Sequence, residues 1–165
     1  MPVAHLELSD STDPYGGLPD SHLLVPAPTV ATRDGRVPLA DWLPRETGRD
    51  GVWAEVVAQF YARAAAAPAV ADYFAGFDMD RLQRHFLAAL VMVTGRGLTV
   101  GTVRRMGAAH IDVRDSAGRP VTADIWTAVL ATLTGILTEH RVPRTTLTHL
   151  AAALAPLRAA IVAEP

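Results

Sequence analysis

The sequence contains no cysteine among its 165 residues. This absence excludes a disulfide scaffold, a zinc–thiolate site and a cysteine nucleophile. An excess of one charge is also lacking, because 15 basic and 17 acidic side chains give a formal charge of -2, which provides no general attraction for nucleic acid or anionic lipid. The longest apolar run, residues 86–93, is far shorter than the roughly 20 residues that span a bilayer. Residues 1–13 are too polar for an export signal, so we expect a soluble cytoplasmic protein that binds neither membranes nor nucleic acid.

Long helices are excluded from the first fifty residues, because prolines and glycines are closely spaced there. Residues 29–38 predict a short hairpin around Asp34-Gly35, and residues 39–43 predict one helical turn. The apolar side chains of this segment can pack on a globular body. We therefore divide the chain into a partly ordered N-terminal extension, residues 1–50, and a domain, residues 51–165.

After residue 50 the apolar residues recur at helical spacing. A first helix is expected to begin after Asp50, which would be its N-cap, and to end at Pro68. A second helix is expected to begin after Asp78 and to continue to about Thr94. Because this second helix is apolar on every side after Phe86, we expect it to lie at the centre of the fold.

Three further helices complete the pattern. A short helix over residues 100–110 has an inward face of three residues: Val103, Met106 and His110. The next helix begins at its N-cap Thr122, and the last helix is expected to bend or break at Pro156. Residues 111–121 form an unusually long connection that could contain a second hairpin. These apolar faces predict an all-α bundle.

The motifs of many enzymes are missing. The sequence has no glycine-rich phosphate loop after a strand, no His-Glu-x-x-His motif and no Gly-x-Ser-x-Gly motif. Two histidines, His85 and His110, lie on or beside the apolar faces of their helices, where each could be an ordinary hydrogen-bonded core residue. Two histidines are too few for a catalytic zinc site. They are enough for haem, because the porphyrin supplies four bonds to iron and the protein supplies one or two.

An ordered series of short motifs extends from about residue 52 to the last helix. The series is Phe60-Tyr61, Tyr73-Phe74 with Gly76, Asp78-Met79-Asp80-Arg81-Leu82, Ala109-His110, Val121-Thr122, Trp126, Val142-Pro143 and Ala155-Pro156-Leu157. In this order and separation the chain resembles the truncated haemoglobins, most closely their first group. The resemblance implies a two-over-two sandwich of helices that binds haem b, which is iron protoporphyrin IX.

The resemblance also implies roles for individual residues. His110 would be the proximal iron ligand, and the Tyr61 hydroxyl would donate a hydrogen bond to bound dioxygen. The other cofactor-binding positions would be Phe60, Phe74, Leu82, His85, Phe86, Met106, Val129 and Arg105. Without haem, the tyrosine hydroxyl would be satisfied by a backbone carbonyl and the phenylalanines would be ordinary core residues.

Two of these positions have alternatives. His85 matches a position where some family members have a distal iron ligand and others have a basic residue that faces a haem propionate. Arg105 is one of four arginines nearest the expected propionates, and each of the four could equally lie on a solvated face. The four are Arg81, Arg84, Arg104 and Arg105.

The sequence departs from the family in three places. Phe86 stands where the family commonly has a polar residue, which removes a hydrogen-bond donor from the expected pocket. The connection after His110 is longer than usual, and the extension before residue 50 has no counterpart. Long additions beside a pocket are often functional, so an activity on an organic substrate is an open alternative.

Three functions follow from these observations. The first is a haem protein that binds dioxygen, nitric oxide or carbon monoxide, with nitric oxide dioxygenase or peroxidase-like chemistry if an external electron donor or oxidant is supplied. The second is a haem enzyme of specialised metabolism that acts on a small organic substrate. The third is a helical interaction module without a cofactor. The oligomeric state is left open.

Overall fold

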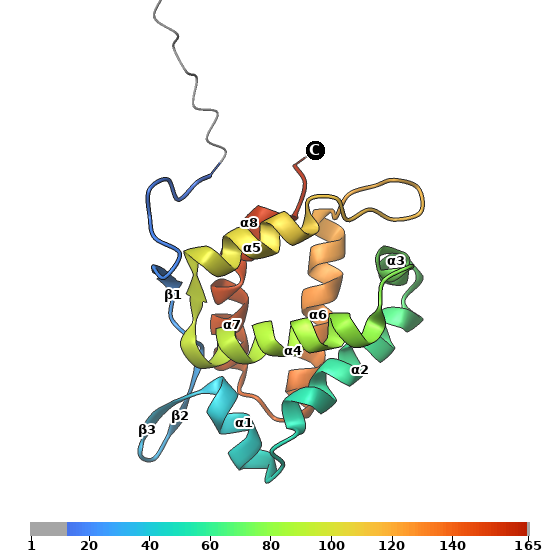
Figure 1. Ribbon diagram of the computed structural model, residues 1–165. Helices are drawn as coiled ribbons and strands as arrows, with labels where there is room; N and C mark the ends of the chain where they lie inside the picture. The colour runs from blue at the N-terminus through green and yellow to red at the C-terminus, as the bar shows by residue number, and fades with distance from the viewer. Residues whose placement is uncertain (1–12, 165) are drawn as a thin grey trace, which may run out of the picture.

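The computed structural model of the protein describes residues 13–164 (Figure 1), so the expectation for residues 1–12 of the extension lies outside the described residues. The helices are α1 (Leu39–Thr47), α2 (Val52–Ala66), α3 (Pro68–Ala71), α4 (Met79–Arg96), α5 (Val100–His110), α6 (Ala123–Glu139), α7 (Arg144–Ala153) and α8 (Ala155–Ile161), with a 3-10 turn η1 (Asp72–Phe74). The strands are β1 (Leu23–Val25), β2 (Thr29–Thr32), β3 (Gly35–Pro38) and β4 (Leu98–Thr99). The described chain is mostly helical, which confirms the all-α class.

The main helices pack against one another in pairs. Helix α2 packs against α4 and α6, α6 packs against α7, and α5 packs against α8. In Figure 1, α4 passes in front of α6 and α7. In Figure 1 the N-terminal strands lie beside α5 and below it, so residues 23–38 of the extension are part of the folded body.

The first predicted helix corresponds to α2, but its start differs from the prediction. The N-cap position is Gly51, and no side chain caps this helix, so the assignment of Asp50 as N-cap was wrong. The predicted apolar face is confirmed, because all its members are buried: Trp53, Val56, Val57, Phe60 and Ala64. Packing of this face determines the position of the helix without a side-chain cap.

Helix α1 is longer than the single turn that was expected, and it continues through Pro44. A proline inside a helix has no N–H to donate to the carbonyl four residues earlier, which is that of Ala40. The indole N–H of Trp53 on α2 donates to this carbonyl oxygen instead, at 3.0 Å. A long-range hydrogen bond therefore satisfies the acceptor that Pro44 leaves free.

Helix α4 begins as predicted, because the Asp78 carboxylate accepts a hydrogen bond from the backbone N–H of Arg81 at 3.2 Å. Its central placement was wrong, since Val91 is 39% exposed and Ala88 is also exposed. Small apolar residues on a surface are common and cost little, so an apolar sequence did not require burial on every side.

The hairpin predicted for residues 29–38 is confirmed, with β2 and β3 paired from Thr29↔Pro38 to Thr32↔Gly35. The break predicted at Pro156 is also confirmed, because α7 ends at Ala153 and α8 begins at Ala155. In the 111–121 connection, a single isolated bridge joins Arg114 and Pro120, so this segment is a loop rather than a full hairpin.

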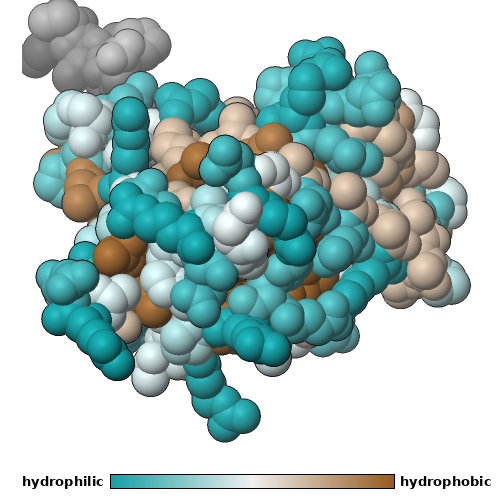
Figure 2. All heavy atoms as spheres, turned by 90° about the horizontal axis from the view of Figure 1, so that it is seen from below, coloured by the Kyte–Doolittle hydropathy of each residue, from teal (hydrophilic) through white to brown (hydrophobic). Residues whose placement is uncertain are grey.

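The apolar interior consists of two clusters of buried residues. The larger cluster joins α1, α2, α6 and α7, and the smaller joins the ends of α4, α5 and α8. Leu154, between α7 and α8, packs against both. Figure 2 shows that the face seen from below is mostly hydrophilic, with strongly apolar atoms in small patches and a paler, weakly apolar area along its right side. Within residues 13–164, no helix has the length and apolar character needed to cross a membrane.

Candidate functional site

The site begins at the last residue of α5. The His110 Nδ1 atom lies 2.7 Å from the backbone carbonyl oxygen of Met106. A carbonyl oxygen has two lone pairs, so it can accept from this side chain as well as from the helix backbone. The bond holds the imidazole against its own helix and fixes the direction of the ring.

This bond also determines where the imidazole proton lies. A carbonyl oxygen can only accept, so Nδ1 must be the donor and the neutral ring has no proton on Nε2. Among the described residues, no hydrogen-bond partner of His110 Nε2 occurs. Metal-binding histidines commonly show this arrangement, with one nitrogen bonded to a backbone carbonyl and the other free to coordinate. His110 can therefore ligate a metal without a change of tautomer.

The predicted inward face of α5 consists of Val103, Met106 and His110, and all three side chains are at least partly buried. Val103 is buried, and Met106 and His110 are half-buried. Met106 and Trp126 of α6 pack against the smaller apolar cluster. The imidazole thus lies beside partly exposed apolar side chains.

The second part of the site is an aromatic group between α2, η1 and α4. The Tyr61 ring contacts Phe60, Phe74 and Phe86, with ring centroids at 5.2, 5.5 and 5.9 Å. The rings of Phe60 and Phe86 are 4.8 Å apart. The structure therefore brings together the four aromatic residues that the sequence offered as candidates.

The Tyr61 hydroxyl is the polar group of this aromatic cluster. It donates to the backbone carbonyl oxygen of Leu82 on α4 at 3.4 Å, which is long for an O–H···O bond. Burial raises the pKa of Tyr61 to about 12, so the hydroxyl keeps its proton to a more alkaline pH than an ordinary tyrosine does. The structure thus shows the hydrogen bond to a backbone carbonyl that was expected for this hydroxyl without haem. Because the bond is weak, the hydroxyl is available to a stronger acceptor.

Three predicted cofactor-binding residues are half-buried rather than enclosed. Leu82 and Phe86 on α4 and Val129 on α6 pack against the larger cluster but keep part of their apolar surface exposed. These residues lie on two different helices. Their uncovered surface is apolar, so contact with a flat apolar group would remove it from water.

His85 does not share the apolar stripe of α4, contrary to the expectation. Its side chain is exposed, and its Nε2 accepts a hydrogen bond from Arg81 Nε at 3.5 Å. Successive residues on a helix are about 100° apart, so His85 is turned away from Phe86. This position fits the propionate or solvent alternative, and an iron ligand here would require the side chain to leave Arg81.

The position of Arg105 fits the solvated-face alternative. It is exposed, and its guanidinium reaches back to the Thr102 hydroxyl at 3.4 Å. Arg105 lies about 140° from His110 around the helix, because five residues separate them. Its guanidinium is therefore on a different face of α5 from the imidazole. Arg104 is bonded to carboxylates of the extension rather than left free for a propionate.

The long connection after His110 is folded around one carboxylate. The Asp115 side chain is 2% exposed and forms an ion pair with Arg119 at 2.7 Å. It also accepts from the backbone N–H groups of Ala117 and Arg119, at 3.0 and 2.8 Å. Hydrogen bonds from the backbone and side chain of Arg119 lower the pKa of Asp115, so the loop is stabilised by an ionised residue at neutral pH.

Two contacts attach this loop to the aromatic corner. The Ser116 hydroxyl donates to the Asp72 carboxylate at 2.7 Å, and the Tyr73 hydroxyl donates to the Pro120 carbonyl oxygen at 2.9 Å. Asp72 and Tyr73 directly precede Phe74. The connection therefore links the end of α5, where His110 lies, to the corner beside Tyr61. These contacts could not be predicted from sequence patterns, because the partners lie 44 and 47 residues apart.

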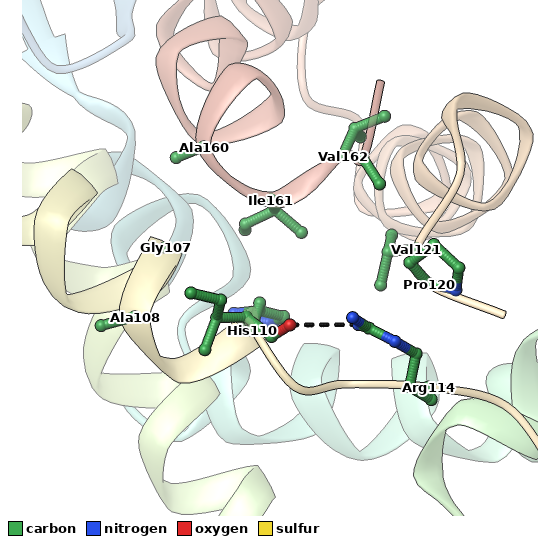
Figure 3. A pocket seen from close by; sticks show the side chains of 11 residues that line it. Gly107, Ala108, His110, Arg114, Pro120, Val121, Ala160, Ile161 and Val162 are labelled. Atoms are coloured by element: carbon green, nitrogen blue, oxygen red, sulfur yellow. Dashed lines mark hydrogen bonds between the residues drawn. The ribbon is translucent and has the colours of Figure 1, made fainter. Parts of the chain in front are cut away.

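A pocket of about 390 Å³ lies beside the end of α5. Figure 3 shows Ile161 at the end of α8, Val162 directly after it and Val121 from the connection facing this space, with His110 at its edge. Arg114 is its charged side chain, and this guanidinium already donates to the carbonyl oxygen of Ile111 at 3.1 Å. The aliphatic lining suits an apolar group. Tyr61 and the phenylalanines are not among its lining residues, so this pocket is separate from the aromatic corner.

Comparison with known proteins assigns no family. No protein-family model matches the chain, and no curated protein is significantly similar to it. Within residues 13–164, no group of three or more potential metal-ligand side chains occurs. The interpretation of the site therefore depends on its own geometry.

Proposed function

We propose that the protein binds one haem b, with His110 as the proximal iron ligand, in a helical body of the truncated-haemoglobin type. The observation that supports this best is the bond from His110 Nδ1 to the Met106 carbonyl oxygen. It leaves Nε2 unprotonated at the end of a helix with an apolar inward stripe. A porphyrin already supplies four donors, so one imidazole is sufficient. When bound, haem would supply an iron atom that takes dioxygen, nitric oxide or carbon monoxide.

The half-buried residues support the same cofactor. Leu82, Phe86, Val129 and Met106 lie on three different helices, and each keeps apolar surface exposed. Burial of such surface contributes about 25 cal/mol for each Å² removed from water. A flat apolar ring placed against these side chains would gain binding energy from all three helices and would exclude water from the iron ligand.

Tyr61 is suited to act on the bound gas. Its hydroxyl is protonated at neutral pH, as any tyrosine is, and burial raises its pKa further, to about 12. Its bond to Leu82 is long at 3.4 Å. The hydroxyl can therefore turn to an acceptor that carries partial negative charge. Donation in a water-poor site stabilises such charge more than donation in water does.

Absorption spectroscopy of the full chain, expressed with haem supply, tests this function. We expect a strong Soret band in the wild-type protein. His110→Gly should lose the band, and free imidazole should partly restore it by replacing the missing ligand. His149→Gly is the matched control, because His149 is exposed on α7 and the substitution introduces the same residue into a helix.

Two results would contradict the proposal. Wild-type protein that stays colourless after reconstitution would exclude haem binding and favour the interaction module. A band that survives His110→Gly would exclude His110 as the ligand. His85→Ala should leave the ferric spectrum unchanged, whereas a change from six-coordinate to five-coordinate iron would identify His85 as a distal ligand.

A further inference from the structure

The N-terminal extension is attached to the first turn of α5. Strand β1 pairs with β4, which immediately precedes this helix, with Leu23 opposite Thr99. The backbone N–H of Val100 donates to His22, and that of Gly101 donates to Asp20, each at 2.9 Å to the carbonyl oxygen. The first N–H groups of a helix have no partner within the helix. The extension therefore supplies acceptors that α5 itself lacks.

Arg104 binds the same segment from the side of the helix. Its Nε and Nη2 atoms donate to the Asp13 carboxylate, and its Nη1 atom donates to the Asp20 carboxylate at 2.8 Å. Nη1 also donates to the carbonyl oxygen of Leu18 at 3.1 Å. Hydrogen bonds from Arg104 and from the backbone of Tyr15 lower the pKa of Asp13. One guanidinium thus joins three points of the extension to α5.

Two glycines permit this close approach. Gly97 has φ +94°, and a Cβ at this position would collide with the carbonyl oxygen of Val25. A Cβ at Gly101 would lie 2.8 Å from the Asp20 Cβ, which is too short for two carbon atoms. Residues with side chains at these positions would force the extension away from α5. The extension and the start of α5 are therefore matched in shape as well as in hydrogen bonding.

Helix α8 supports another part of α5. A Cβ at Gly107 would lie 3.3 Å from the Cβ of Ala160, so the two helices are tightly packed. Helix α5 is thus supported by the extension near its start and by α8 further along. A helix rises about 1.5 Å per residue, so Arg104 and His110 are about 9 Å apart along the axis. A rigid helix of this length would pass a displacement of its start to its end.

We propose that residues 13–25 are part of the proximal side of the site, and that Arg104 is a positioning residue that sets the placement of His110 through α5. This inference rests on the proposed function. Without the extension, the start of α5 would lose its backbone acceptors and its charged partners. The imidazole would then approach the iron with a wider range of orientations.

Hydrogen exchange of the haem-free full chain tests the attachment itself. Arg104→Ala should increase the exchange rates of α5 amides by about fivefold or more, because the helix opens locally more often. Arg104→Lys should give much of this effect, since a lysine cannot bond several acceptors in fixed directions. Arg63→Ala is the matched control, because it removes another ion pair between elements, at 2.6 Å from Glu139, without touching α5.

Resonance Raman spectroscopy of the ferrous haem-loaded chain tests the positioning role. We expect the iron–histidine stretching band to shift and broaden in both Arg104 variants and to stay unchanged in Arg63→Ala. A merely stabilising role would leave this band in place. Asp20→Asn is a milder variant that keeps the test valid if Arg104→Ala fails to fold.

The outcomes separate the two proposals. If the wild-type protein binds no haem, the proposed function and the role of Arg104 in it are both wrong. If haem binds but the Arg104 variants show an unchanged iron–histidine band, only the positioning inference is wrong. Exchange in α5 that matches the Arg63→Ala control would also overturn the inference.

Discussion

The imidazole Nδ1 of His110 lies 2.7 Å from the carbonyl oxygen of Met106, one turn earlier in the same helix. The bond needs only the helical backbone, so α5 orients its own histidine. The residues that would face the other side of a haem belong to α2 and α4. The proposed site therefore combines one locally determined ligand with partners that tertiary packing supplies.

The haem-free protein should contain the Nδ1–H tautomer of neutral His110. The Met106 carbonyl can only accept a hydrogen bond, so it selects this form. Heteronuclear NMR that correlates ring nitrogens with ring protons above pH 8 measures the tautomer. His149, which is exposed on α7, is the reference for an unconstrained ring. A predominant Nε2–H form at His110 would show that the bond is absent in solution.

Tyr61→Phe should make dioxygen dissociate about tenfold faster from the haem-loaded protein. The substitution removes one hydrogen bond, and roughly 1.4 kcal/mol corresponds to a factor of ten. Carbon monoxide carries less negative charge when bound, so its dissociation should change much less. Stopped-flow ligand replacement measures both rates. Equal changes for the two gases would indicate a steric effect rather than the loss of a donor.

The same tyrosine should make the protein less stable at alkaline pH. Burial raises the pKa of Tyr61 from 10.0 to about 12, so the unfolded state ionises first as the pH rises. The stabilisation is fully present below pH 10 and is lost between pH 10 and about pH 12. Denaturant unfolding should therefore show that the wild-type protein loses stability relative to Tyr61→Phe over this range. Parallel stability curves would contradict the raised pKa.

Asp115→Asn should loosen the loop between α5 and α6. The ionised carboxylate accepts from the amides of Ala117 and Arg119 and from the Arg119 guanidinium, and an amide cannot replace all three bonds. Exchange of these two amides at pH 7 should become about tenfold faster. Because the pKa of Asp115 is lowered, the wild-type loop should keep its protection above the ordinary carboxyl pKa and lose it only as the pH falls through the lowered value. Ser116→Ala, which breaks only the contact with Asp72, should leave the Asp115 bonds protected.

Trp53→Phe should destabilise the protein less in a Pro44→Ala background than in the native chain. In the native chain the Trp53 indole satisfies the Ala40 carbonyl that Pro44 leaves free, and a buried unsatisfied acceptor costs about 1–3 kcal/mol. Alanine at position 44 restores the helical N–H donor. A double-mutant cycle in urea should show a coupling of about 1 kcal/mol between the two positions. Equal costs in both backgrounds would show that the indole bond contributes nothing.

Local features of the fold could be predicted from the sequence. The Asp78 and Thr122 caps, the bounds of α5 and the hairpin after Thr29 all depend on residues within a few positions of one another. Apolar spacing also predicted the buried face of α2. It failed for the centre of α4, because spacing shows which residues are apolar but not how many neighbours surround the helix.

Short-range hydrogen bonding and apolar periodicity were enough to predict the longer helices, several of their ends and the place of His110 on the apolar stripe of α5. The three-dimensional packing was needed to show that Arg104 binds Asp13 across 91 residues, that His85 is exposed and that the 111–121 loop is joined to the aromatic corner. Such contacts depend on how whole elements meet in space. No local sequence pattern therefore predicts contacts between residues that lie far apart in the chain.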